Sequence, residues 1–326
     1  MILDVARHKF YEGFATLLLT TLTLIVLLAI GVGEEAAWSA PASPIMSLLD
    51  KITFGIPFLN KTLAVLLYAT GVLSLSRATI RTHIYPADTL ASMALCAVMT
   101  LPMVVGEYAL REALIVLLMG MTLGHMFYCY RPRFAPRHLF TTMLAAGLLP
   151  AVEASLVIVP IAIAIALIVA RKRMRDALIV ITAMLLPLFS CFYILWLMGE
   201  GFADSALVWW RSVTTPIEYH ILDSISIARL CFLAFALFLQ CVASLCQLSH
   251  SDTSTAQARG AWRALHLIFV VVTCGLIFMP SASDSMITVA TVVSAAMLPA
   301  FFVCNGFIIS TIGYTALFAL AFAAAL

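Results

Sequence analysis

The sequence predicts an all-α protein, a polytopic bundle of transmembrane helices formed by residues 1–326 as a single domain. Three observations predict this class. Hydrophobic residues make up 63% of the chain and charged residues only 10%, whereas a soluble domain carries about 25% charged residues. The mean hydropathy is +1.09. The apolar residues also form long continuous runs, which are typical of membrane helices and not of the alternating strands of a β-barrel.

Eleven apolar runs are predicted to span the membrane, because a helix needs about 20 mainly apolar residues to cross the hydrocarbon core. In chain order they are residues 14–32, 58–76, 89–106, 112–130, 138–151, 154–170, 177–198, 225–246, 265–280, 286–303 and 307–325. The last two runs meet at Asn305 and Gly306, and these C-terminal residues could be divided into spans in another way. The expected range is therefore 10 to 12 spans.

The fifth and sixth spans divide one apolar stretch of 33 residues, 138–170. As a single helix this stretch would reach about 50 Å, whereas the hydrocarbon core is about 30 Å thick. The basic segments RPRFAPRH (131–138) and RKRMRD (171–176) border the stretch. Both are expected in the cytoplasm, so the chain between them must cross an even number of times. We therefore predict a turn on the far side, marked by Pro150 and Glu153.

The charge distribution sets the predicted orientation. With the N-terminus in the cytoplasm, 13 of the 18 Lys and Arg residues lie on the cytoplasmic side of the predicted spans, as the positive-inside rule requires. Eleven of the 16 Asp and Glu residues lie on the opposite side, a bias that this rule does not explain. We expect a multi-pass protein of the bacterial inner (cytoplasmic) membrane with an acid-rich outer face.

Two outer loops are longer than spanning requires, residues 33–57 and 199–224. In the first loop, Ser43 suits a helix N-cap and Pro44 suits the first helical position. Apolar residues then recur at helical spacing, namely Ile45, Leu48, Leu49 and Ile52. We predict a short helix that lies in the outer membrane interface and ends before Gly55.

The second outer loop begins with the segment FADSALVWWRSV, which places Trp209 and Trp210 side by side. Tryptophan is enriched at the boundary between the hydrocarbon core and the headgroups. We therefore predict that both indoles lie at the membrane interface, with Arg211 beside the lipid headgroups.

Three carboxylates stand where apolar runs end on the outer side. Glu34 and Glu35 lie in GVGEEAAW, immediately after the first run, and Glu107 follows the third. A carboxylate beside the low-dielectric membrane can have a raised pKa and act as a general base. We therefore predict that Glu34, Glu35 and Glu107 are catalytic. The alternatives are that outer span ends simply carry polar residues, and that Glu107 pairs with Arg111 four residues later.

Arg229 lies within the eighth predicted span, about two turns from its start, where a charge is costly and usually functional or paired. Its guanidinium suits a phosphate group. The loop before it holds Glu218, His220 and Asp223, and we predict that these four residues bind substrate. The alternatives are that Arg229 extends to the surface or pairs with Asp223 or Glu218, and that His220 is an interfacial polar group.

Several kinds of site are not indicated by the sequence. The eight cysteines form no CxxC and the seven histidines form no HxxxH or HExxH, so no metal site is predicted. There is no Walker motif and no GxGxxG, and the net charge of +2 is too small to suggest binding of nucleic acid. The identity of any cofactor stays open.

The first outer loop, which opens with Glu34 and Glu35 and carries a helix along the membrane, resembles that of the GT-C glycosyltransferases. These polytopic enzymes transfer a sugar from a polyprenyl phosphate on the extracytoplasmic face. The resemblance covers the first four predicted spans. It implies that Glu34 or Glu35, and then Glu107, act as base or metal ligand, and that Arg229 holds the lipid phosphate. This chain has Glu where Asp is commoner, and we expect no counterpart of the soluble C-terminal domain that many members carry.

A second resemblance rests on the segments LNKTLAVLLY, TLPMVVGEY and MLPAFFVCNGFI. They look like parts of an uncharacterised family of bacterial polytopic inner-membrane proteins. This resemblance implies the membrane location and no activity.

Three functions follow as hypotheses. The first is a transferase that uses a polyprenyl-phosphate-linked sugar on the extracytoplasmic face, with that lipid as its partner. The second is a transporter or flippase for a lipid-linked or amphipathic substrate, built around the short spans near Pro150 and around Arg229. The third is a non-catalytic subunit that binds another membrane protein. All three place the chain in the lipid bilayer.

Overall fold

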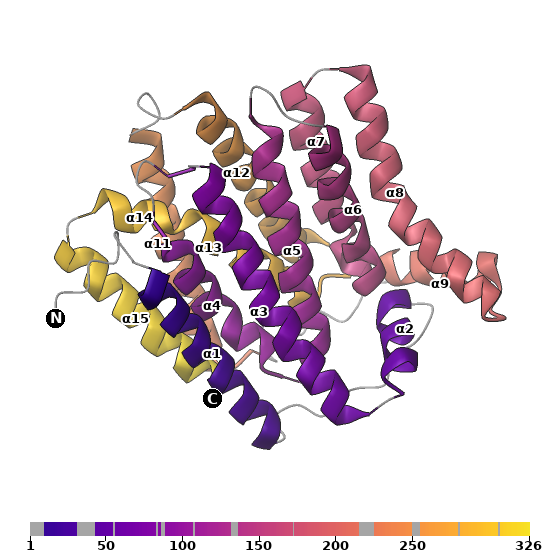
Figure 1. Cartoon of the computed structure of the whole chain (residues 1–326), viewed down its shortest axis with the longest axis horizontal. Helices are drawn as coiled ribbons and strands as arrows, with labels where there is room; N and C mark the ends of the chain where they lie inside the picture. Colours follow the sequence, from indigo (N-terminus) through magenta and orange to yellow (C-terminus); the bar gives the residue numbers. More distant parts are fainter. Residues whose placement is uncertain are drawn as a thin grey trace.

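The computed structural model of the chain describes residues 10–30, 43–54, 56–82, 84–85, 89–106, 108–131, 136–171, 173–214, 225–249, 255–279, 281–305 and 307–326. In this part of the chain every regular element is a helix (Figure 1). In order they are α1 (Phe10–Ile30), α2 (Pro44–Thr53), α3 (Pro57–Thr82), α4 (Ala91–Val104), α5 (Ala109–Cys129), α6 (Pro136–Val152), the 3-10 helix η2 (Ala154–Val157), α7 (Ile158–Arg171), α8 (Met174–Leu197), α9 (Phe202–Thr214), α11 (Ile227–Ser249), α12 (Ala256–Phe278), α13 (Asp284–Met297), α14 (Pro299–Cys304) and α15 (Phe307–Ala325).

These helices confirm the predicted all-α polytopic bundle. Within the described residues, nine helical segments are long and apolar enough to cross a membrane, with α13 and α14 counted together and η2 counted with α7. The two remaining predicted spans correspond to α4, with 14 residues, and α6, with 17. Both are shorter than the roughly 20 residues that a bilayer core requires.

The short helices α4 and α13 form the centre of the bundle and pack against each other. Every residue of α4 except Met103 is buried, and every residue of α13 except Asp284 and Ala290. Two tyrosine hydroxyls bind their carbonyl groups: Tyr68 donates to Ala97 O at 2.6 Å, and Tyr85 donates to Ala296 O at 2.5 Å. Because other helices surround them, α4 and α13 present little surface to lipid.

Helices α3 and α5 approach each other closely through two glycines. A Cβ atom on Gly120 would lie 2.5 Å from the carbonyl oxygen of Gly71. A Cβ atom on Gly71 would lie 2.8 Å from the backbone of Leu117. Small residues permit such close contact of backbones in membrane helices. This crossing joins two long helices in the middle of the bundle.

The predicted turn between the fifth and sixth spans is confirmed. Helix α6 ends at Val152, Glu153 follows, and η2 and α7 return through the bundle. Trp209 of α9 covers this turn, and its indole N–H donates to the carbonyl of Pro150 at 2.8 Å. The prediction that Trp209 lies at the lipid interface is therefore wrong, because its ring is buried against α8, whereas Trp210 is exposed.

The predicted helix in the first outer loop is α2, which begins at Pro44 after Ser43 and ends where Phe54 adopts a left-handed conformation, with φ of 54°. Its predicted apolar stripe does not act as one face. Met46 is fully buried and Ile52 is 70% exposed, because α2 packs beside α6 and α8.

The two ends of the bundle differ in charge. At one end, the upper one in Figure 1, Arg131 donates to the carbonyl of Arg81, and the Gln257 side chain donates to the carbonyl of Thr82 at 3.2 Å. Helix α8 also begins there, after Arg173. We call this the basic end. Arg81, Arg131 and Arg173 are among the arginines that the sequence places in the cytoplasm.

The opposite end holds α2, α9 and the turn at Glu153, at the lower right of Figure 1. There Lys51 Nζ lies 3.7 Å from Glu200 Oε1. Helix α5 begins at this end, and so does α13, which carries Asp284 at its first position. We call this the acidic end.

Candidate functional site

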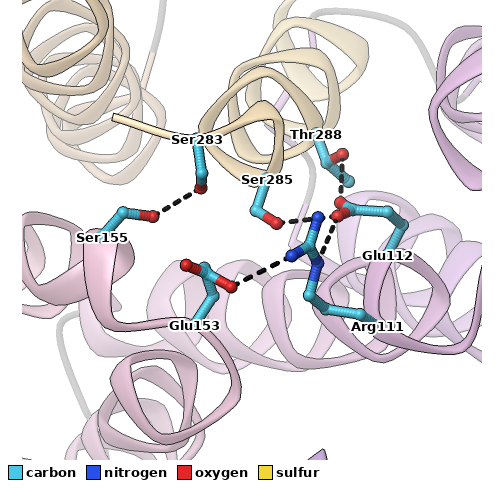
Figure 2. Close-up of polar contacts among 7 residues, drawn as sticks. All are labelled: Arg111, Glu112, Glu153, Ser155, Ser283, Ser285 and Thr288. Atoms are coloured by element: carbon cyan, nitrogen blue, oxygen red, sulfur yellow. Dashed lines mark hydrogen bonds and ion pairs between the residues drawn. The ribbon is translucent and has the colours of Figure 1, made fainter. Parts of the chain in front are cut away.

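A buried charge cluster lies at the acidic end, where α5 begins (Figure 2). Arg111 Nε donates to Glu112 Oε1 at 2.8 Å, and Arg111 Nη1 donates to Glu153 Oε2 at 3.1 Å. Arg111 is 8% exposed and Glu112 is 4% exposed. A buried ion pair is tolerated only when further hydrogen bonds satisfy its oxygens and protons. The surrounding helices supply these bonds.

Glu112 is held by the first turns of α13. Ser285 Oγ donates to Glu112 Oε1 at 2.7 Å, and Thr288 Oγ1 donates to Glu112 Oε2 at 2.6 Å. The N-terminal end of a helix also favours a negative charge beside it. The hydroxyls of Ser155 and Ser283 lie 2.6 Å apart and join the α6–α7 turn to the start of α13. Figure 2 shows these contacts between three parts of the chain.

Glu153 differs from Glu112 because 19% of its side chain remains exposed. Burial raises the pKa of the Glu153 carboxyl above its ordinary value, while the Arg111 guanidinium opposes this shift. Glu153 forms the second ion pair of Arg111, and part of its side chain remains at the surface.

A pocket of about 270 Å³ lies beside this cluster, between α4, α5, α11 and α13. We call it the charged pocket, because four of its lining residues are Arg, Asp or Glu. They are Arg111, Glu112, Arg229 and Asp284. The ring of Tyr108 also lines it and lies 4.2 Å from the Arg111 guanidinium carbon.

Arg229 is the third residue of α11, and the hydroxyl of Ser226 accepts a hydrogen bond from its backbone N–H at 3.2 Å. The prediction that it lies two turns into a span is wrong, because Arg229 lies in the first turn of α11, which begins at Ile227. Its side chain is half-buried and donates to two carbonyl oxygens, Val105 O at 2.8 Å and Ala324 O at 3.4 Å. In the described chain Arg229 forms no ion pair. Its described partners are neutral groups, and its guanidinium lines the pocket.

Asp284 contributes an exposed carboxylate to the same pocket. As the first residue of α13, it lies at the end of the helix dipole that favours a negative charge. Among residues with described positions, no cation lies within salt-bridge distance of it. The charged pocket therefore presents one guanidinium and one carboxylate that are not paired with each other.

An apolar groove of about 430 Å³ continues from the charged pocket between α11, α12 and α13. The two cavities share three lining residues, Ile225, Leu233 and Ile287. The groove extends along α13 from Ile287 to Ser294, a distance of seven residues. Seven residues of helix correspond to about 10 Å, or a third of a bilayer core. The groove is thus deep enough to hold a hydrocarbon chain.

One of the predicted site residues, Arg229, has a described position, and it lies in the charged pocket. The remaining predicted residues lie outside the described part of the chain; they are Glu34, Glu35, Glu107, Glu218, His220 and Asp223. Gly106 and Tyr108, which flank Glu107 in the sequence, line the charged pocket.

Sequence reasoning missed Arg111 and Glu112 as the centre of this site. Arg111 was expected to pair with a residue one helical turn away, and its described partners are the next residue and Glu153, 42 positions later. The signal that could have found them is the doublet Arg111-Glu112 at the start of a long apolar run. Glu153 lies in the next predicted connection between spans on the outer side of the membrane.

No protein-family model matches the sequence, and no curated protein or solved structure is similar to it. The described residues include no group of three or more His, Cys, Asp or Glu side chains that could hold a metal ion. The charged pocket and the apolar groove are therefore the features from which a function can be inferred.

Proposed function

We propose that this multi-pass membrane protein binds a lipid-linked phosphate at the acidic end, and that it transfers a sugar from a polyprenyl phosphate on the extracytoplasmic face. One observation carries the proposal: a pocket with an arginine outside any described ion pair opens into a deep apolar groove. A ligand that fills both cavities must combine a polar, charged head with an apolar tail.

Arg229 supports a phosphate as the head. Its two described acceptors are backbone carbonyls, so no described carboxylate neutralises it. Arg111, in contrast, is already neutralised by Glu112 and Glu153. The planar guanidinium presents several donors that match the oxygens of a phosphate, and such charge-assisted bonds are the stronger ones.

The apolar groove supports a lipid as the tail. Its lining includes Leu237, Phe269 and Ile277, and the last is 63% exposed, which places it toward the lipid side of α12. A tail in the groove would contact helices on three sides and continue into the bilayer. Each buried CH₂ group contributes about 0.8 kcal/mol to binding of such a chain.

The transfer reaction needs a base for the acceptor hydroxyl. The hydroxyl oxygen bonds to the anomeric carbon of the sugar, the bond from that carbon to the phosphate oxygen breaks, and the lipid phosphate leaves with the electron pair. The hydroxyl proton passes to a carboxylate. Asp284 is the exposed carboxylate of the charged pocket. Glu34, Glu35 and Glu107 remain further predicted bases.

A change of Arg229→Gln is expected to weaken binding of farnesyl phosphate by about tenfold to a hundredfold, because a hydrogen bond to a charged group contributes about 1.5–3 kcal/mol. Arg229→Lys should retain part of the affinity. Calorimetry on the detergent-solubilised protein measures both, with farnesol as the ligand that lacks the phosphate. Arg211→Gln removes one positive charge from the exposed side of α9, away from the pocket, and serves as the control. Equal affinity of Arg229→Gln and wild type would contradict phosphate binding here.

A change of Asp284→Asn is expected to lower sugar transfer from a polyprenyl phosphosugar by about a hundredfold or more, as loss of a general base does. Binding of farnesyl phosphate should persist, because Arg229 is unchanged. Glu34→Gln, Glu35→Gln and Glu107→Gln are assayed beside it with a radiolabelled sugar. Full transfer activity in all four variants would contradict the assignment of these acids as bases.

A transporter or flippase for the same lipid is the second candidate function. The observation that favours it is the interruption between α13 and α14 at Leu298-Pro299, where both residues are buried. Discontinuous helices often line substrate sites in transporters. Movement of a fluorescent polyprenyl phosphate between the leaflets of proteoliposomes, without any acceptor sugar, would favour transport over transfer.

A further inference from the structure

A second pocket, of about 480 Å³, lies on the α3–α5 pair toward the basic end. Its polar lining comes from two facing rows of side chains. Helix α3 contributes Thr70, Ser74, Arg77 and Arg81, and α5 contributes His125 and Tyr128. We call it the basic pocket. It shares no lining residue with the charged pocket or the apolar groove.

The charge of the basic pocket has one sign. Arg77 and Arg81 stand one helical turn apart, both exposed, and its lining contains no Asp or Glu. In the described chain neither arginine forms a salt bridge. A third arginine, Arg131, lies over the Tyr128 ring at 4.8 Å and donates to the carbonyl of Arg81. An anion here would meet cations with no described competing carboxylate.

Two histidines adjoin these arginines. His125 Nδ1 lies 3.3 Å from His138 Nδ1, and the His138 ring stacks on Tyr128 with the ring centroids 4.9 Å apart. A hydrogen bond between two imidazole nitrogens needs one donor and one acceptor. The pair therefore holds the α5 wall of the pocket against α6 and adds a polar group to its lining.

The shape of the basic pocket suits a lipid more than a soluble ion. On α5 all of its lining residues follow Gly120, and on α3 they run from Thr70, beside Gly71, to Arg81 near the basic end. Gly124 lines the pocket, and its missing side chain leaves a shallow floor beside Ala78, whose Cβ would lie 3.2 Å from an added Cβ. Leu73 and Met121 line the part farther from the basic end, together with Thr70. The cavity thus changes from cationic to apolar along the direction that a phospholipid would occupy.

We propose that the basic pocket binds the phosphate headgroup of an anionic phospholipid, with an acyl chain beside Leu73 and Met121. The positive-inside rule accounts for arginines at this end of a helix. It does not account for a cavity between two helices that gathers two arginines and a histidine without an acid. Cationic pockets between transmembrane helices on the cytoplasmic side bind anionic headgroups. This site is independent of the proposed transferase, because it lies at the opposite end of the bundle.

Native mass spectrometry of the detergent-solubilised full chain tests the proposal. The protein is titrated with phosphatidylglycerol, with phosphatidylcholine as the reference of no net charge. The double variant Arg77→Gln/Arg81→Gln should bind phosphatidylglycerol about tenfold or more weakly, since each arginine near an anionic headgroup contributes about 1 kcal/mol, or a factor of about five. The variant Arg77→Lys/Arg81→Lys should keep most of the affinity. Farnesyl phosphate should bind to both variants as to wild type.

The matched control is Arg173→Gln/Arg175→Gln, which removes two exposed charges from the basic end at the start of α8, outside the pocket. It should change binding by less than about twofold if the attraction is local. An equal loss in the control and in the pocket variant would overturn the proposal, and so would equal affinity of wild type for the two lipids. Displacement of phosphatidylglycerol by millimolar inorganic phosphate would assign the site to a soluble anion and also overturn it.

Discussion

Arg111 and Arg229 line the same pocket in different electrostatic surroundings. Arg111 is paired with two carboxylates, whereas the described acceptors of Arg229 are carbonyl oxygens. A substrate anion that approached Arg111 would compete with Glu112, whose two oxygens are themselves bound by Arg111, Ser285 and Thr288. At the scale of single residues, Arg111 and Glu112 therefore serve the structure, and Arg229 is available to a ligand.

This structural role of the cluster predicts that loss of Glu112 lowers stability more than loss of Glu153. Glu112→Gln should lower the free energy of unfolding by about 3–5 kcal/mol, because it leaves the buried Arg111 without its nearest counter-charge. Glu153→Gln should cost about 1 kcal/mol or less, because partly exposed ion pairs contribute little. Thermal unfolding in detergent, followed by intrinsic tryptophan fluorescence, compares the two variants. A melting temperature for Glu112→Gln equal to that of wild type would show that the Glu112 carboxylate does not hold α5 to α13.

Helices α11, α12 and α13 act together as a support for the apolar groove. Helix α13 lies between the other two and packs against both, and the groove follows it from Ile287 to Ser294. Because α13 also carries Asp284 and the hydroxyls that bind Glu112, a shift of this one helix would change the charged pocket and the groove together.

Bulk placed in the groove should act on the lipid tail alone. Thr273→Phe fills the groove from α12 and is expected to weaken the binding of farnesyl phosphate about tenfold. About two CH₂ groups of the tail would lose their contacts, and each contributes about 0.8 kcal/mol. Binding of a short-chain analogue, isopentenyl phosphate, should be unchanged. Cys274→Phe adds the same ring on the exposed side of α12, outside the groove, and is the control. If both variants weaken the long and short ligands alike, the groove does not hold the tail.

At the scale of the whole molecule, the separation of charge predicts the orientation. The basic end should face the cytoplasm and the acidic end the outside. In a variant whose eight cysteines are replaced, Asp204→Cys on α9 should react with a membrane-impermeant maleimide in intact cells. Arg173→Cys, before α8, should react only after lysis. The reverse pattern would invert the topology and move the charged pocket to the cytoplasmic side.

Much of this architecture could be predicted from the sequence because it depends on long, simple patterns. The apolar runs predicted the bundle, and the two basic segments around 138–170 predicted the turn at Glu153. The short helix from Pro44 followed from its N-terminal signals. Each of these features rests on spacing along the chain, which a sequence contains directly.

The arrangement of side chains could not be predicted in the same way. Adjacent residues on a helix do not normally face each other, so nothing indicated that Arg111 would bind Glu112. Their other partners, Glu153 and Ser285, are 42 and 173 positions away from the residues they bind. Trp209 and Trp210 look alike in sequence, and only the packing of α9 on α8 decides that Trp209 turns inward. Such contacts depend on which helix faces lie together.

The bond between Arg111 and Glu112 also bears on biosynthesis. A lone arginine that leaves the translocon in an apolar segment meets an insertion penalty of about 2.5–3.5 kcal/mol at the centre of the span and less near its end. Because Glu112 is the very next residue, the two emerge from the ribosome together and can enter the membrane as a neutral unit. Glu153 and Ser285 are synthesised later and complete the cluster. The arginine thus has a counter-charge at every stage of chain elongation, long before the pocket around it exists.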